Sequence, residues 1–106
     1  MPVTIRGKAD KELSQVAKTL ETYAAAHPKA DIVLYRQNSV SIRVRIVSQH
    51  FASASRADRE DEVWEELTGL PEDVVSQISL LLLLTPGEAK ESFANYEFEH
   101  PVASRF

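Results

Sequence analysis

The feature that most constrains the fold is a run of five leucines, Leu80–Leu84, which ends at a strong helix-start signal. The segment Thr85–Glu88 combines an N-cap threonine, a proline at the first helical position and a capping glutamate. A short apolar run with such an end is typical of a strand buried on both faces, although leucine favours helix by propensity. We predict a strand over residues 77–84 and a helix from Thr85 to about Tyr96. The apolar side of that helix is expected to carry Ala89, Phe93 and Tyr96.

Hydrophobic periodicity predicts a helix and a hairpin upstream. Apolar residues recur at helical spacing over 13–24, after a good N-cap at Asp10. His27 precedes a proline, which disfavours helical backbone and ends this helix. Alternation predicts strands over 31–36 and 40–48, joined by a short polar turn that makes them antiparallel. One face of the second strand is expected to carry Val40, Ile42, Val44 and Ile46.

A second helix is expected from near Ser55, which forms a capping-box-like pair with Asp58, to Gly69 at its C′ position. One more helical turn is expected through Val75. The predicted order is α-β-β-α-β-α, an α+β fold with a three-stranded mixed sheet flanked by helices. The third strand is reached through a helix, so a right-handed crossover makes it parallel to a neighbour. If the leucine strand is covered on both faces, helices lie on both sides of the sheet.

Length and composition are those of one ordinary globular domain. The chain has 106 residues, of which 43% are hydrophobic and 26% charged, and it has no cysteine. We assign residues 1–96 to a single domain and 97–106 to a C-terminal tail. The first nine residues lack the apolar stretch of a signal peptide, and the leucine run is too short to span a bilayer. We therefore expect a cytoplasmic protein that does not bind membranes.

Residue types that carry catalysis or metal binding show no recognisable pattern. Glycine occurs only at positions 7, 69 and 87, which excludes the common phosphate-binding loops and the G-x-x-G loop of RNA-binding KH domains. His27, His50 and His100 lack a second ligand at helical spacing, so we expect three solvated loop histidines. The carboxylates over residues 58–66 are expected to form a solvated helix face. The sequence thus predicts no cofactor and no metal site, and it favours a non-enzymatic protein. The alternative is an enzyme of unrecognised type, which would need a deep pocket with convergent polar groups.

Four arginines are candidate binding residues. Arg43 and Arg45 share one face of a predicted strand, and Arg56 and Arg59 lie on one side of the second helix's first turn. Arginine pairs bind phosphates or a partner's carboxylates. In the alternative interpretation, Arg43 and Arg45 lie over the sheet and pair with acidic neighbours. A nucleic-acid-binding transcriptional regulator is thus one function to consider, although a net charge of −4 gives no general attraction to nucleic acid.

The stretch from Phe51 to Trp64 resembles the central motif of the BolA family. The matching or conservatively replaced positions are Phe51, Ser53, Ser55, Arg59, Val63 and Trp64. The resemblance extends to residues 24–34, 40–48 and 84–88, where the Leu-Thr-Pro that ends the leucine run is similar to the end of the family's third strand. It covers about residues 13–89.

The resemblance implies a three-stranded sheet with packed helices, similar to class II KH topology without G-x-x-G. It also implies a non-enzymatic protein, because BolA-like proteins pair with monothiol glutaredoxins and share an iron–sulfur cluster with them. Some members are DNA-binding regulators of stress and morphology. Here Glu60 and Gln77 stand where the family has histidine, and the loop over residues 37–39 lacks His and Cys. Because oxygen ligands replace imidazole or thiolate poorly on iron, we expect partner binding without a shared cluster.

The leading hypothesis is therefore a BolA-like adaptor or regulator that binds a protein partner, with the oligomeric state left open. The binding face would include the turn from Ser53 to Arg59 and the neighbouring strand ends. The candidate binding residues are Arg43, Arg45, Ser53, Ser55, Arg56 and Arg59.

Overall fold

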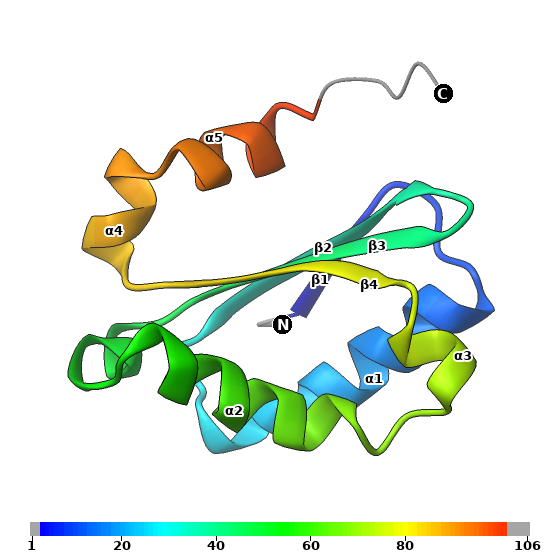
Figure 1. Ribbon diagram of the computed structural model, residues 1–106, viewed down its shortest axis with the longest axis horizontal. Coiled ribbons are helices and arrows are strands. Elements are labelled where there is room, and N and C mark those ends of the chain that lie inside the picture. Colours follow the sequence, from blue (N-terminus) through cyan, green and yellow to red (C-terminus); the bar gives the residue numbers. More distant parts are fainter. Residues whose placement is uncertain (1–2, 102–106) are drawn as a thin grey trace.

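A four-stranded mixed sheet forms the centre of the chain, and helices cover both of its faces (Figure 1). The computed structural model describes residues 3–101. The elements are β1 (Val3–Arg6), α1 (Lys11–Ala26), β2 (Asp31–Asn38), β3 (Ser41–Val47), the 3₁₀ helix η1 (Gln49–Ser53), α2 (Arg56–Leu67), α3 (Glu72–Val75), β4 (Ile78–Leu84), α4 (Pro86–Glu91) and α5 (Phe93–Glu99).

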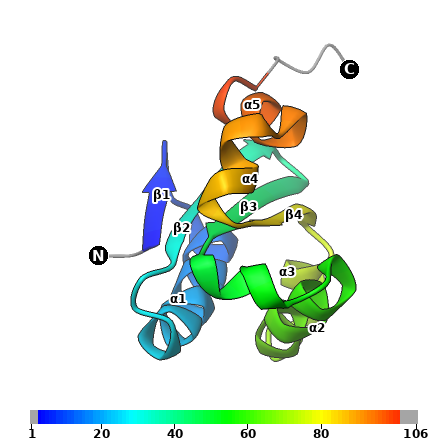
Figure 2. The same ribbon diagram turned by 90° about the vertical axis from the view of Figure 1, so that its left-hand side faces the viewer.

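The strands lie in the order β1-β2-β3-β4. β2 and β3 form an antiparallel hairpin, whereas β1 pairs with β2 and β4 pairs with β3 in parallel. Figure 2 shows α1, α2 and α3 on one side of the sheet and α4 and α5 on the other. The α+β class, the mixed sheet and the helices on both sides are confirmed.

The prediction of three strands is wrong, because β1 adds a fourth at the edge of the sheet. β1 has only four residues, of which Val3 and Ile5 are half-buried while Thr4 and Arg6 are exposed. Such a segment carries too few apolar residues to be recognised from alternation. Its parallel pairing with β2 holds this segment as a strand, which the local residue pattern alone does not predict.

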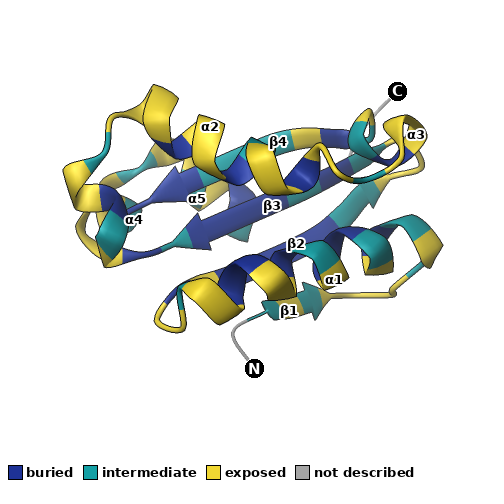
Figure 3. Cartoon of the chain, turned by 90° about the horizontal axis from the view of Figure 1, so that it is seen from below, coloured by how far each residue is buried: buried dark blue, intermediate teal, exposed yellow. Residues whose placement is uncertain are grey.

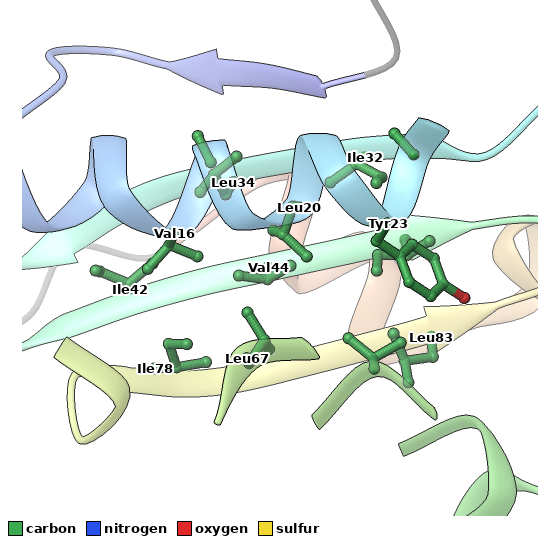
Figure 4. Packing of buried hydrophobic residues seen from close by; sticks show 14 of the residues in the cluster. Val16, Leu20, Tyr23, Ile32, Leu34, Ile42, Val44, Leu67, Ile78 and Leu83 are labelled. Atoms are coloured by element: carbon green, nitrogen blue, oxygen red, sulfur yellow. The ribbon is translucent and has the colours of Figure 1, made fainter. Parts of the chain in front are cut away.

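The main core lies between the sheet and the helices α1 and α2, whose outer surfaces are exposed (Figure 3). The predicted stripe of α1 is buried, and its side chains meet those of β2, β3 and β4 (Figure 4). Labelled members of this cluster include Val16, Leu20, Ile32, Leu34, Ile42, Val44, Leu67, Ile78 and Leu83. Val40, expected on the inner face, is instead exposed in the turn before β3.

The leucine run forms β4 and contributes to both faces, as its unbroken apolar pattern predicts. Leu81 and Leu83 pack with the main core, whereas Leu80 and Leu82 pack with a second cluster on the opposite face. Phe98 of α5 lies at the centre of that second cluster and is fully buried.

The helix predicted to run to Tyr96 is two helices, because the chain becomes extended at Ser92. The Ser92 side chain then caps α5 by accepting a hydrogen bond from the Asn95 amide (3.1 Å). The predicted apolar side is wrong, since Phe93 is 93% and Tyr96 66% exposed. The expected boundary between residues 96 and 97 falls inside α5, and residues 102–106 of the expected tail lie outside the described residues.

Docking of α5 is expected to depend on Phe98 and not on its exposed neighbour Phe93. Phe98→Ala should lower the free energy of unfolding by about 3 kcal/mol, because it opens a cavity in the second cluster. Phe93→Ala, the matched control, should change it by less than about 0.5 kcal/mol. Urea unfolding of both variants measures this. Equal losses in the two variants would contradict the packing of α5.

Candidate functional site

Arg43 and Arg45 lie under α5 and pair with its acidic residues. Arg43 forms an ion pair with Glu97, and Arg45 forms one with Glu99. The Arg45 guanidinium also donates to the Asn95 side chain (2.9 Å) and lies 5.0 Å from the centre of the Phe98 ring. Arg45 is only 6% exposed. This arrangement is the one expected if the two arginines lie over the sheet and pair with acidic neighbours.

Arg59 is buried to the same degree, at 6% exposure, and joins several elements. Its Nε donates to the Phe51 carbonyl and its Nη1 to the Leu83 carbonyl, both at 3.1 Å. Its guanidinium also forms an ion pair with Glu88 (2.7 Å). Because these donors are already satisfied inside the chain, Arg59 holds the fold in place rather than presenting charge to a partner.

The two serines of the motif have local structural contacts. The Ser55 hydroxyl caps α2 by accepting a hydrogen bond from the Asp58 amide (3.1 Å), as the capping pattern predicts. The Ser53 hydroxyl donates to the His50 carbonyl (3.3 Å) within the turn. These contacts shape the turn between β3 and α2.

Arg56 differs from the other three arginines because its side chain is exposed and has no ion pair within residues 3–101. It lines a pocket of about 250 Å³ with Arg59, Glu60 and the four leucines 81–84 of β4. Successive residues of a strand point to opposite faces, so a pocket lined by four in a row follows the strand edge. The structure therefore brings Arg56 and Arg59 together with β4 but leaves Arg43 and Arg45 on the α5 face.

Histidines that lie far apart in the sequence meet at the end of α1. The His27 and His50 rings stack with their centres 4.1 Å apart and their planes inclined by 8°. His50 Nε2 lies 3.0 Å from a Glu62 oxygen and 2.9 Å from the Tyr23 hydroxyl. The expectation of solvated loop residues is wrong for both, since each is half-buried and in contact with the other. No residue spacing in the sequence predicts this cluster, because its members come from three separate elements.

The charges of this cluster are coupled. Burial opposes ionisation of Glu62, but hydrogen bonds from Tyr23 and His50 outweigh it and hold the pKa of this carboxyl below its ordinary value. Burial, and then the hydrogen bond to Glu62, raise the pKa of Tyr23 well above its ordinary value. Glu62 is therefore an anion and Tyr23 a neutral donor at neutral pH.

The positions that the BolA resemblance implies for a cluster ligand do not fit such a group. The Gln77 side chain accepts from Arg36 (2.8 Å) and donates to the Asp73 carbonyl (3.1 Å). Glu60 is exposed on α2, and residues 37–39 contain neither histidine nor cysteine. These oxygen and amide groups do not replace the imidazole or thiolate ligands of iron–sulfur clusters.

Comparison with family models, with curated proteins and with solved structures gives no match for this chain. Across residues 3–101, every helix is too short or too polar to cross a bilayer.

Arg59 is expected to be required for stability, and Arg56 is not. Arg59→Ala should lower the free energy of unfolding by about 3 kcal/mol, because it removes a buried, hydrogen-bonded cation and leaves carbonyl groups without donors. Arg56→Ala removes an exposed side chain and should change it by less than about 0.5 kcal/mol. Guanidinium unfolding compares the two, and similar losses would show that Arg59 is not the structural member of the pair.

Acid is expected to weaken the contact between α5 and the sheet. Hydrogen bonds from Arg6 and then Arg45 lower the pKa of Glu99 to about 2, whereas an unfolded glutamate titrates at about 4.3. Between these two pKa values the folded state thus binds fewer protons than the unfolded state. The stabilisation by ionised Glu99 is therefore present at higher pH and is lost as the pH falls to about 2.

Glu99→Gln tests this dependence. At pH 6 we expect it to be about 1.5–3 kcal/mol less stable than the wild type, because charged hydrogen bonds to Arg45 are weakened. The difference should shrink as the pH falls towards about 2.5. Glu91→Gln, at an exposed carboxylate, serves as the control. Denaturant unfolding at each pH measures the difference, and a constant difference for Glu99→Gln would contradict this role of the carboxylate.

Proposed function

We propose that this chain is a non-enzymatic, BolA-like adaptor that binds a protein partner along the edge of β4. The order of elements from α1 to α4 supports the proposal. From α1 to α4 the elements follow the order helix, hairpin, helix, parallel strand and helix that the sequence predicts, with short helices η1 and α3 on either side of α2. The sheet also contains a fourth strand, β1, which the resemblance does not imply.

The contacts of the motif residues also support the resemblance. Phe51 is fully buried, and the Arg59 guanidinium lies 5.6 Å from the centre of its ring. Val63 is buried in the same core, one helical turn after Arg59. A motif whose apolar members fill the core and whose arginine fixes the turn has a structural reason for its spacing.

The open edge of β4 is the observation that carries the binding proposal. Within the described chain, β4 has a strand neighbour on one side only. An unpaired edge offers backbone N–H and C=O groups to an extended segment of another chain. Here the available groups lie before the Leu83 carbonyl, which already accepts from Arg59. The pocket along this edge supplies apolar side chains, and Arg56 supplies a positive charge at its rim. We therefore expect the partner to bind through an extended apolar segment that carries a carboxylate.

Exposed aromatic residues extend this surface. Ser92 lines both the β4 pocket and a second hollow that Phe93 and Tyr96 also line. Aromatic side chains are enriched at protein–protein interfaces, where they bury large areas at low cost in conformational entropy. We define the docking surface as the β4 edge with Arg56, Phe93 and Tyr96.

The arginines give no comparable support to nucleic-acid binding. Arg43, Arg45 and Arg59 are engaged in ion pairs with glutamates, and they do not share one face. A phosphate backbone is bound by several cations gathered on one surface. Protein binding is therefore the function we propose, together with the cytoplasmic location expected from the sequence.

A monothiol glutaredoxin is the partner class to test, because the resemblance implies it. Arg56→Glu should weaken its binding at least about tenfold, since the new charge repels the partner's carboxylate. Lys18→Glu makes the same charge change on the exposed side of α1 and should bind like the wild type. Isothermal titration calorimetry of the purified proteins measures both. An absence of binding, or equal weakening by the two variants, would contradict the proposal.

A further inference from the structure

Three side chains with metal-binding atoms converge where α1, β3 and α2 meet. His27 is the C-cap residue of α1, His50 lies in η1 directly after β3, and Glu62 lies in the middle of α2. One potential ligand atom from each lies within 4.8 Å of the others. The group is separate from the docking surface, so a role for it is independent of the proposed function.

His50 is held so that one ring nitrogen faces the other two groups. Its Nδ1 lies 2.5 Å from the Ser48 hydroxyl, which fixes the ring from behind. Its Nε2 faces Glu62 and the Tyr23 hydroxyl. A histidine ligand usually has its second nitrogen hydrogen-bonded in this way, because the bond sets the tautomer and aims the lone pair.

Tyr23 orients the carboxylate in turn. Its hydroxyl donates to Glu62 at 2.5 Å, and Figure 4 shows the ring at the edge of the core with its oxygen turned away from the aliphatic cluster. Because this hydroxyl donates to the carboxylate, it is a supporting donor and not a ligand. The Glu62 carboxylate keeps lone pairs for a cation.

The contacts of His50 place a hydrogen atom between its ring and Glu62, at the position where a metal ion would fit. Because Tyr23 donates its hydrogen to Glu62, the short approach of His50 Nε2 to the same carboxylate needs an N–H hydrogen between them. In the neutral imidazole Nδ1 carries no hydrogen, so the Ser48 hydroxyl donates to it. When a cation replaces that hydrogen, His50 moves its proton to Nδ1 and donates it to Ser48, so the hydrogen bond between them is kept with its direction reversed.

We propose that His27, His50 and Glu62 form a binding site for a divalent transition-metal ion of the Zn²⁺ type. Two imidazole nitrogens and one carboxylate oxygen are a donor set that Zn²⁺ accepts, with distances of about 2.0–2.2 Å. The site offers three protein ligands and leaves a fourth position for water or another donor. The negative end of the α1 dipole, whose last turn holds no basic residue, adds a favourable field.

His27 closes the site by turning its ring. Its lone pairs and those of His50 lie in nearly parallel planes while the rings are stacked, so one ion cannot lie in both planes. A hollow of about 260 Å³, lined by His27, Pro28 and His50, gives the His27 ring room to rotate. Binding of the ion thus replaces the stacking of the His27 and His50 rings with coordination by both.

The site uses none of the positions at which the family resemblance implies ligands, which are Glu60, Gln77 and residues 37–39. Gln77 lies beside the first residues of β3, where its carbonyl accepts from the Ile42 amide (2.7 Å). His50 comes after the last residues of β3, at the opposite end of the strand. The site is therefore assigned from this chain's own side chains.

Titration of the full chain with Zn²⁺ by isothermal calorimetry, and with Co²⁺ by visible absorption, tests the site. The wild type should bind one ion per chain. His27→Ala and Glu62→Gln should each weaken binding at least about tenfold, since loss even of an outer-shell partner costs about 10–100-fold in affinity. His100→Ala, the matched control, removes the histidine outside the cluster and should bind like the wild type.

His27 is half-buried at a helix end, so His27→Ala keeps the fold and circular dichroism verifies it. Glu62→Gln keeps an acceptor for Tyr23 and provides a second, independent variant. Absence of binding by the wild type would overturn the site. Wild-type affinity in either ligand variant, or equal weakening by His100→Ala, would overturn it too.

Discussion

Burial of the Arg59 guanidinium is the interaction on which the arrangement around β4 depends. A buried cation has to find acceptors for its donors, and Arg59 finds them in η1, in β4 and in α4. Glu88 is shared, because the same carboxylate accepts from the Thr85 amide (2.9 Å) and completes the capping box of α4. One side chain thus fixes the turn after β3, the last residues of β4 and the start of α4.

This constraint also shapes the surface that we propose for binding. Arg59 draws α2 and α4 to the end of β4, and α5 then continues across the opposite face of the sheet. The β4 edge lies between these helices, with Arg56 one turn away from the buried arginine. The sequence pattern predicts a binding role for both arginines, but the structure gives the two different positions. Arg59 positions the strand, and Arg56 remains available to a partner.

Local signals predicted much of the fold. The capping residues Asp10, Ser55 and Thr85 each accept the hydrogen bond that their position predicts. The leucine run forms a strand covered on both faces, for the reason that its pattern lacks alternation. These features depend on neighbours in the sequence, which is why they could be predicted.

Other features depend on contacts between distant segments. β1 forms a strand because it pairs in parallel with β2. The chain turns at Ser92, and this turn allows Phe98 to reach the second cluster. The pairing of Arg45 with Glu99 and the stacking of His27 on His50 join residues from different elements. The candidate site was predicted only in part, because sequence spacing identifies Arg56 and Arg59 as neighbours but not which of them is buried.

Binding of a partner along the edge of β4 is the central claim. Hydrogen–deuterium exchange of backbone amides, with and without a monothiol glutaredoxin, tests it most directly. We predict slower exchange in residues 80–84 and 92–96 when the partner is present, because an added strand and covered helix ends protect those amides. Unchanged exchange there, with protection confined to the outer side of α1, would contradict the claim.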